Sequence, residues 1–324
     1  MCQNDQLISV AIIHYKVTRN LTTTTIRAIE LDACRLLRIG GEDRLEFLQG
    51  QLTQDVTRIS QEGAAWAGWA SAKGRLLATG QLLGTADALL WPLPADIVEG
   101  VTRRLGMFRL RARVDLEVAD WKIVGLCGLD PDTDFVSGDL RLGTEGAVAV
   151  ADMVGARVLG DPARAWLCGP TDTLVQWCTS SGFASGSAAE WRLLDIRAGL
   201  PSVVSATSET FVPQMLNLDL LDGISFTKGC YVGQEIVART QNLGRIKRRM
   251  HRFGTAMTVR LEPGASIYGP AAATGKVVMI APADDGMELT AVIAIDDADG
   301  DWFADEARTV RLERLTLPYR IPNA

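Results

Sequence analysis

The chain has 324 residues, of which 47% are hydrophobic and 22% charged, and a formal net charge of -6 at pH 7. This composition excludes wholesale disorder, and a single hydrophobic core stops growing near ~250 residues, so two or three packed domains are expected. The negative charge argues against a protein that coats nucleic acid generally, but it is compatible with a local basic patch.

The cysteines and histidines indicate no metal site. Six cysteines are scattered without a C-x-x-C pair, and the two histidines cannot form a cluster by themselves. This scatter is typical of reduced thiols in a cytoplasmic protein. The early apolar run Leu7–Ile13 is broken by Ser9 and is too short to span a bilayer, so no membrane partner is expected. Residues 1–29 are interpreted as a poorly ordered extension or the product of a start codon assigned too early.

Residues 30–118 predict a first compact α+β unit, which residues 196–244 are expected to complete. Its expected elements in chain order are a strand over Arg35–Ile39, a helix over Asp43–Gln51, a hairpin of Ala65–Trp69 and Leu76–Leu83, a strand over Leu89–Leu93, a helix over Ala95–Phe108 and a strand over Ala112–Val118. The tip of the hairpin is Lys73-Gly74-Arg75.

Two further units are expected. Residues 119–195 predict a second α+β unit, with three strands and a helix over Thr171–Cys178. Residues 245–324 contain short alternating segments separated by Pro, Gly and Asp turns, which is typical of a small antiparallel barrel or sandwich.

The segment Lys228–Arg239 carries the strongest chemical signal. Gly229 and Gly233 permit a tight loop, and a helix is expected to begin near Gln234. Cys230 then faces a helix N-terminus with Lys228 two residues away, an arrangement that favours a reactive thiolate. The alternative is a packed, inert cysteine, but the polar neighbours argue against a core position.

The octapeptide Lys228–Glu235 resembles the signature of the YgfZ family, folate-binding proteins related in fold to the aminomethyltransferase (T-protein) of glycine cleavage. Other segments resemble that family in the same order, over roughly residues 30–324: Phe47–Asp55, Lys73–Arg75, Arg197–Pro201, Phe211–Met215 and Asn217–Asp219. Aminomethyltransferases instead carry an acidic residue in the hairpin region and lack the octapeptide. Since Lys73-Gly-Arg75 cannot act as a base there, classical aminomethyl transfer is the less expected activity.

The resemblance implies a three-domain cloverleaf around a central channel that binds tetrahydrofolate or a one-carbon derivative. It also implies a role in maintaining iron-sulfur enzymes, including those that thiomethylate tRNA. The expected catalytic residues are Cys230, Lys228 and Tyr231. The expected folate-binding residues are Lys73, Arg75, Gln214, Asn217, Gln234, Glu235 and Arg239, because amides can read the pterin edge and cations suit the glutamate tail. The alternative is that Gln214 and Asn217 only cap turns and that the hairpin cations are solvated.

The segment Gly244–Arg252 contains five cations in nine residues. Its plainer interpretation is a solvated linker, and the alternative is an edge that binds polyglutamate or tRNA through Arg245, Lys247, Arg248, Arg249 and Arg252.

Three functions stay open from the sequence. The first is a tetrahydrofolate-binding accessory protein for iron-sulfur client enzymes, with a reactive Cys230. The second is a folate-dependent one-carbon transferase that uses Cys230 or Glu235. The third is a module that binds tRNA or a protein. One cysteine cannot hold a four-coordinate cluster, so any cluster contact must be shared with a partner.

Overall fold

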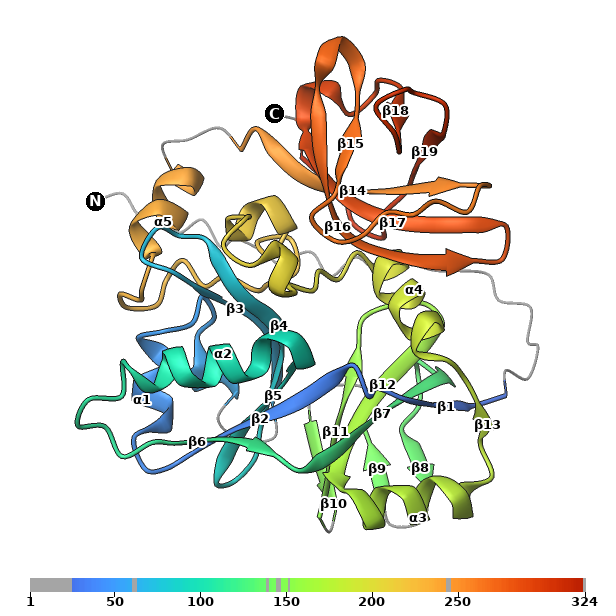
Figure 1. Ribbon diagram of the computed structural model, residues 1–324. Coiled ribbons are helices and arrows are strands. Elements are labelled where there is room, and N and C mark those ends of the chain that lie inside the picture. Colours follow the sequence, from blue (N-terminus) through green and yellow to red (C-terminus); the bar gives the residue numbers. More distant parts are fainter. Residues whose placement is uncertain are drawn as a thin grey trace, which may run out of the picture.

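A computed structural model describes residues 25–59, 63–137, 140–143, 147–150, 152–242 and 246–322. It shows two sheet-containing units and a C-terminal closed barrel packed together (Figure 1). The expected α+β class and the C-terminal antiparallel barrel are confirmed. No helix in the described ranges is long and apolar enough to cross a membrane.

The first sheet is antiparallel, with the strand order β3-β4-β5-β2-β6. Its elements are β2 (Cys34–Gly40), α1 (Arg44–Gln49), η1 (Val56–Ile59), β3 (Ala64–Ala70), β4 (Leu76–Gly84), β5 (Ala88–Pro94), α2 (Ala95–Gly106) and β6 (Asp115–Ala119). The α2 helix buries Ile97, Val98, Val101 and Leu105, a spacing that puts one apolar face on the sheet.

The second sheet has the order β10-β11-β12-β7-β1-β13. Its unit contains β1 (Arg27–Glu30), β7 (Trp121–Leu129), β8 (Phe135–Ser137), β9 (Leu140–Leu142), β10 (Ala147–Val150), β11 (Met153–Val158), β12 (Ala163–Pro170), α3 (Thr171–Ser181), β13 (Ala184–Ser185) and α4 (Ala188–Ala198).

Strand β1 corrects the boundary expected for the N-terminal extension. Residues 1–24 lie outside the described residues, but Arg27–Glu30 pairs with β7, and Ile29 lies opposite Gly125. The Ile29 side chain is fully buried, so its apolar contacts fix the strand in the second sheet. Residues 27–29 therefore belong to the fold.

A connecting stretch contains η2 (Ser205–Thr207), η3 (Pro213–Leu216) and α5 (Gln234–Asn242). The barrel that follows has the order β14-β17-β16-β15-β18-β19. Its elements are β14 (Arg248–Thr255), β15 (Ser266–Tyr268), η4 (Pro270–Ala272), β16 (Thr274–Ala283), β17 (Gly286–Ala294), η5 (Ile295–Asp297), β18 (Trp302–Phe303) and β19 (Arg311–Leu315).

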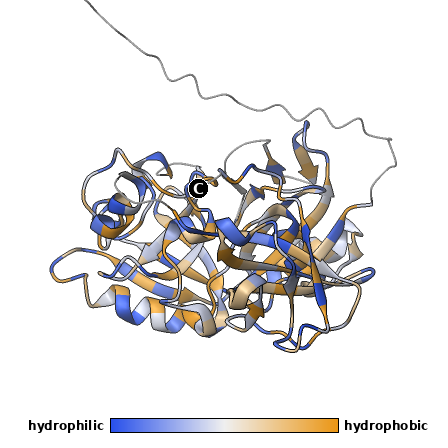
Figure 2. Cartoon of the chain, turned by 90° about the horizontal axis from the view of Figure 1, so that it is seen from above, coloured by the Kyte–Doolittle hydropathy of each residue, from blue (hydrophilic) through white to orange (hydrophobic). Residues whose placement is uncertain are grey.

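The largest hydrophobic cluster lies where the three units meet, and we call it the junction core. It includes Leu36 of the first sheet, Trp166 of the second, Leu194 of α4 and Val278 of the barrel. Figure 1 shows α4 directly against the barrel strands, and Figure 2 shows apolar residues on strands toward the middle of the molecule. The units are therefore held together by shared apolar burial.

Candidate functional site

The cysteine loop and the hairpin tip lie side by side. Helix α5 begins at Gln234, as predicted, and the Gln234 side chain accepts a hydrogen bond from the Tyr231 amide at 3.2 Å. Gly233 has φ +82°, and a Cβ there would lie 2.5 Å from the carbonyl oxygen of Ser71. Gly74 has φ +66°, and its added Cβ would lie 2.7 Å from the Cβ of Ile236. Glycine at both positions thus lets two distant motifs pack together.

Lys228 anchors the cysteine loop from inside. Its ammonium donates to the carbonyl oxygens of Leu52 at 2.9 Å and Gln54 at 2.8 Å. It also lies over the Tyr231 ring, 5.2 Å from the centroid. Burial lowers the pKa of Lys228 to about 8 and raises that of Tyr231 to about 12. The positive charge of Lys228, which the sequence placed beside the Cys230 thiol, therefore points into the interior, because the carbonyl oxygens of Leu52 and Gln54 bind it there.

Cys230 itself is exposed, unlike the other four described cysteines. Burial raises the pKa of the Cys34 and Cys127 thiols to about 12. Cys230 is thus the described thiol that a large reagent or partner can reach. Its reactivity stays a prediction.

Gln214 and Asn217 have fully buried side chains that take part in internal hydrogen bonds. The Gln214 amide donates to the carbonyl oxygen of Val237 at 2.8 Å. The Asn217 amide donates to the carbonyl oxygen of Met250 at 2.8 Å, and its backbone ends η3 with φ 59°. Both side-chain bonds reach residues more than 20 positions away, so they are tertiary contacts and not turn caps, and the buried Gln214 side-chain oxygen has no partner among the described residues. Their role toward a ligand stays a prediction.

Other expected folate contacts lie on the surface. Lys73, Glu235 and Arg239 are exposed, and Arg75 donates to the carbonyl oxygen of Thr210. The contact between the hairpin tip and α5 gathers these residues at one edge of the first unit. Their role toward a ligand stays a prediction.

The basic segment before the barrel is only partly solvated, which corrects the solvated-linker interpretation and, for Arg249 and Arg252, the alternative of a tRNA edge. Arg249 is 3% exposed and forms a two-pronged ion pair with Asp219, at 2.6 and 2.8 Å. Arg252 pairs with Glu288 at 2.7 Å. Both arginines lie on β14, where neighbouring elements cover them. Lys247 and Arg248 are exposed, and Arg245 lies outside the described residues.

Two adjoining cavities lie between the two sheets and α4. The larger, of ≈ 420 Å³, is lined by residues that include Trp66, Gln81, Arg157 and Arg164. The smaller, of ≈ 100 Å³, contains Trp66 and Gln81 in its lining and adds Trp166, Trp191 and Asp195. The larger volume is in the range of small-molecule sites. We call this pair the Trp66 cavity.

The polar groups of the Trp66 cavity are arranged by long-range contacts. Asp195 pairs with Arg164 at 2.6 Å, and the Arg164 guanidinium stacks 4.6 Å from the centroid of the Trp191 ring. Burial raises the pKa of Asp195, with Arg164 opposing the shift.

Two tryptophan N–H groups in this cavity differ. The Trp166 N–H donates to the Gln81 side chain at 2.9 Å. The buried Trp66 indole N–H has no partner within the described part of the chain. An unpaired buried donor beside a cavity is suited to a ligand acceptor.

None of the ten site residues predicted from the sequence lines the Trp66 cavity. Its lining comes from three separate stretches of the chain: Trp66 and Gln81 from the first sheet, Trp166 from the second and Trp191 from α4. In the sequence, these lining residues stand out only as tryptophans in expected strands and helices. Tryptophans in such positions are also typical of a hydrophobic core.

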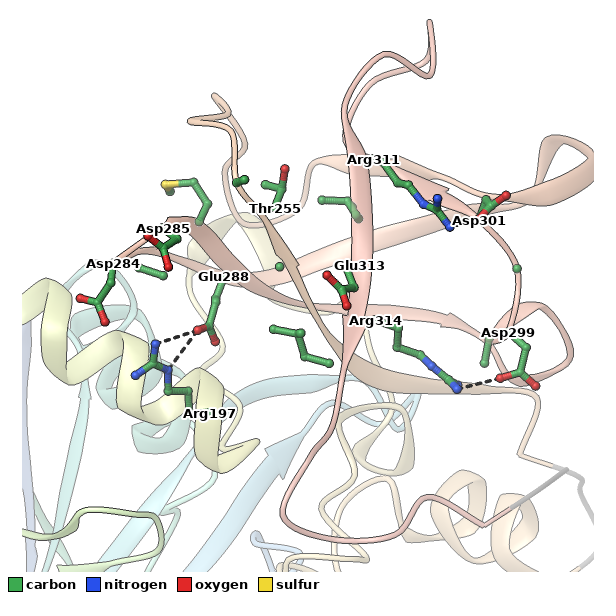
Figure 3. A pocket seen from close by; sticks show the side chains of 18 residues that line it. Arg197, Thr255, Asp284, Asp285, Glu288, Asp299, Asp301, Arg311, Glu313 and Arg314 are labelled. Carbon is green, nitrogen blue, oxygen red and sulfur yellow. Dashed lines mark hydrogen bonds and ion pairs between the residues drawn. The ribbon is translucent and has the colours of Figure 1, made fainter.

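A further cavity of ≈ 940 Å³ lies elsewhere, lined by barrel residues and by Arg197 of α4 (Figure 3). Arg197 of α4 pairs with Glu288 at 2.8 Å, and Arg314 pairs with Asp299 at 2.7 Å. Further acidic residues, Asp284, Asp285 and Glu313, also line it, and none of the described residues in its lining is aromatic. It offers no flat apolar surface to an aromatic ligand.

Metal ligands do not gather anywhere in the described ranges: no three His, Cys, Asp or Glu side chains are placed to hold an ion together.

The fold is that of aminomethyltransferase T. The crystal structure of the glycine cleavage system aminomethyltransferase T from Bartonella henselae superposes with a TM-score of 0.71 over 92% of this chain and 87% of that chain. Sequence identity is 14%, so this similarity shows the fold alone. No protein-family model matches the chain.

Curated relatives define the family. The tRNA-modifying protein YgfZ of Vibrio vulnificus strain YJ016 is 30% identical over 239 residues, covering 72% of this chain and 71% of that protein. The proteins of that name from Colwellia psychrerythraea and Escherichia coli O7:K1 are each 28% identical, over 90% of this chain and 93% and 92% of their own lengths. The chain belongs to the YgfZ family, and the resemblance seen in its motifs is confirmed.

Proposed function

We propose that this protein binds a reduced folate in the Trp66 cavity and acts in tRNA modification. The names of its relatives, tRNA-modifying protein YgfZ, support the second part. The observation that carries the first part is the cavity itself, which combines ≈ 420 Å³ of space with a buried, unpaired indole N–H.

The residues of the cavity fit a folate chemically. The indole walls of Trp66, Trp166 and Trp191 suit a flat pterin, since aromatic rings pack favourably in offset or edge contacts. The Trp66 N–H offers a donor and the Asp195 carboxylate an acceptor.

Arg157 suits the negatively charged end of a folate. Its guanidinium donates to the carbonyl oxygens of Gly143, Asp130 and Thr133 at 2.8 to 3.2 Å. Asp130 and Asp134 lie near enough to act on this charge electrostatically, and a carboxylate of the glutamate tail would be a further acidic partner at the cavity wall.

The folate proposal is tested by calorimetric titration of purified protein with tetrahydrofolate. Trp66→Phe keeps an aromatic wall but removes the N–H, and we expect a loss of roughly 2- to 10-fold in affinity, the usual net effect of one hydrogen bond. Trp177→Phe is the matched control, because its buried N–H is also unpaired and lies away from the cavity. Equal affinities for the wild type and both variants would refute placement at Trp66.

The exposed Cys230 carries the second part of the proposal, a thiol that supports iron-sulfur enzymes, including tRNA-thiomethylating ones. A single exposed thiol can attack or bind transiently, and a cluster contact would need ligands from a partner. Cys230→Ala should abolish restoration of tRNA thiomethylation in a deletion strain, whereas the partly buried Cys178→Ala should preserve it. Full restoration by Cys230→Ala would eliminate the thiol role.

A one-carbon transferase is the second candidate, and Asp195 is the observation that favours it. This carboxylate lines the smaller part of the cavity, where burial raises its pKa and suits it to proton transfer. Steady turnover of methylene-tetrahydrofolate by the wild type, lost in Asp195→Asn, would establish a transferase. Binding without turnover would leave the accessory role.

A further inference from the structure

The last turn of α2 and the connection from α2 to β6 form a strongly basic stretch of the chain. Residues 103–113, here called the basic loop, contain five arginines and no acidic residue. Arg104 pairs with Glu209 at 3.2 Å, and Arg113 pairs with Glu42 and Asp43. The other three, Arg103, Arg109 and Arg111, are exposed or at the loop surface and have no acidic partner within the described ranges. Three positive charges therefore face solvent together.

The same loop presents large apolar side chains to water. Met107 is 67% exposed, Phe108 41% and Leu110 90%. The loop is nevertheless ordered by backbone hydrogen bonds, from Phe108 to Leu105 at 3.0 Å and from Ala112 to Arg109 at 2.7 Å. Exposed apolar side chains held in a fixed loop are typical of interaction surfaces.

The backbone conformation of Leu110 is also unfavourable for folding. Its φ of 45° lies in the left-handed region, which is unfavourable for a residue with a Cβ. Neither this strain nor the exposure of Leu110 stabilises the fold. A binding role gives a reason for both.

Phe108 is supported from beneath. Its ring meets the buried Trp69 ring edge-on, with centroids 6.5 Å apart. Trp69 in turn donates to the Gln51 side chain at 3.4 Å. Gln51 lies between Gly50, which accepts from the Val232 amide, and Leu52, which accepts from Lys228. Residues 50–52 and Trp69 therefore contact both Phe108 and the loop that contains Cys230. Figure 1 shows α5 and the α2–β6 connection at the same edge of the molecule.

We propose that the basic loop binds unpaired nucleotides of an RNA. Arg103, Arg109 and Arg111 would contact phosphates, and the supported Phe108 ring would stack on a base. Proteins bind single strands in this way, with cations along the backbone and aromatic rings under successive bases. The inference rests on the tRNA-modification role proposed above, and it moves the RNA contact away from the 244–252 segment, where Arg249 and Arg252 are engaged internally.

The test is fluorescence anisotropy of labelled, unmodified tRNA transcript with full-length protein at several salt concentrations. Three phosphate contacts predict that log K falls with log salt with a slope of about -2. Arg103→Ala/Arg111→Ala should reduce the slope to about -0.7. Lys247→Ala/Arg248→Ala is the matched control, since it removes two exposed cations elsewhere and should keep the full slope. Arg103→Lys/Arg111→Lys retains the charges and should also keep it.

Stacking is tested separately with Phe108→Ala, which should weaken binding roughly 5- to 150-fold, the range measured for removal of a base-stacking ring. Fully double-stranded RNA should compete poorly. Absence of tRNA binding at low salt, equal losses in the two charge variants, or equal competition by double-stranded RNA would each overturn the inference. In the first case the loop would be assigned to a protein partner instead.

The same variants separate this inference from the folate proposal. All should bind tetrahydrofolate with wild-type affinity, since their side chains line no part of the Trp66 cavity. The charge variants should keep the wild-type melting temperature, whereas Phe108→Ala should lower it slightly because its ring packs on Trp69. Loss of RNA binding with folate binding intact supports the basic loop. Failure of folate binding in the wild type would refute the cavity proposal without touching the RNA result.

Discussion

The ion pair between Arg249 and Asp219 gives a sharp test of the structure, because both interpretations of the sequence, a solvated linker and an RNA-binding edge, placed Arg249 at the surface. Its guanidinium contacts both carboxylate oxygens of Asp219 and donates to the carbonyl oxygen of Gln214 at 3.1 Å. The two side chains are 3% and 8% exposed. Arg249→Ala would leave the buried Asp219 carboxylate without its ion-pair partner, and breaking such a pair typically costs about 3–5 kcal/mol.

The measurement is the free energy of unfolding from urea titration. Lys247→Ala, two residues away and exposed, is the control and should change stability by no more than about 0.5 kcal/mol. A double variant, Arg249→Met/Asp219→Leu, should recover much of the loss, since replacing both charges removes the unpaired carboxylate. A loss below about 1 kcal/mol for Arg249→Ala would show that Arg249 is solvated, and the reasoning about β14 would be wrong.

Two predictions concern pH. The pKa of Lys228 is about 8 in the fold and near its usual 10.5 when unfolded, so the unfolded chain binds more protons between these values and stability rises with pH across them, by up to ~3 kcal/mol. Lys228→Met should lose this rise, and parallel wild-type and variant curves of unfolding free energy between pH 7.5 and 10.5 would contradict it. Burial lowers the pKa of His251 to about 4, so its stabilising neutral form is lost as pH falls from about 6.5 through 4, again by up to ~3 kcal/mol. His251→Phe should flatten the acid limb of the stability curve, and an unchanged acid limb would show that His251 is not the group responsible.

Local signals in the sequence predicted the elements well. Glycines at 229 and 233 indicated the loop before α5, and the Pro, Gly and Asp turns after residue 252 indicated the barrel strands. Both features depend on backbone preferences within a few residues, so they can be read without knowledge of the tertiary structure.

The sequence predicted the exposure of charged side chains less accurately, because burial depends on the tertiary structure. The run around Arg249 looked solvated by composition, yet Arg249, Met250, His251 and Phe253 of β14 are all buried. Burial of Arg249 depends on Asp219, which supplies the charge partner from 30 residues away, and no local pattern in the sequence indicates that contact.

The cavity could not be predicted from the sequence. Trp66, Trp166 and Trp191 come together only when the two sheets and α4 pack, and Asp195 reaches them from the same helix as Trp191. A tryptophan at a wall of a ligand site and a tryptophan in a core have the same local sequence signature.

The junction core has a consequence for dissecting the protein. Val278, Met279 and Val292 of the barrel are buried in the same cluster as residues of both sheets and α4, and the Tyr319 hydroxyl after the last strand donates to the Gly199 carbonyl oxygen at 2.8 Å. A fragment that stops near residue 245 would therefore cut through a hydrophobic interior and not through a linker. The barrel covers apolar residues of the other two units, so all three units should unfold together in one thermal transition.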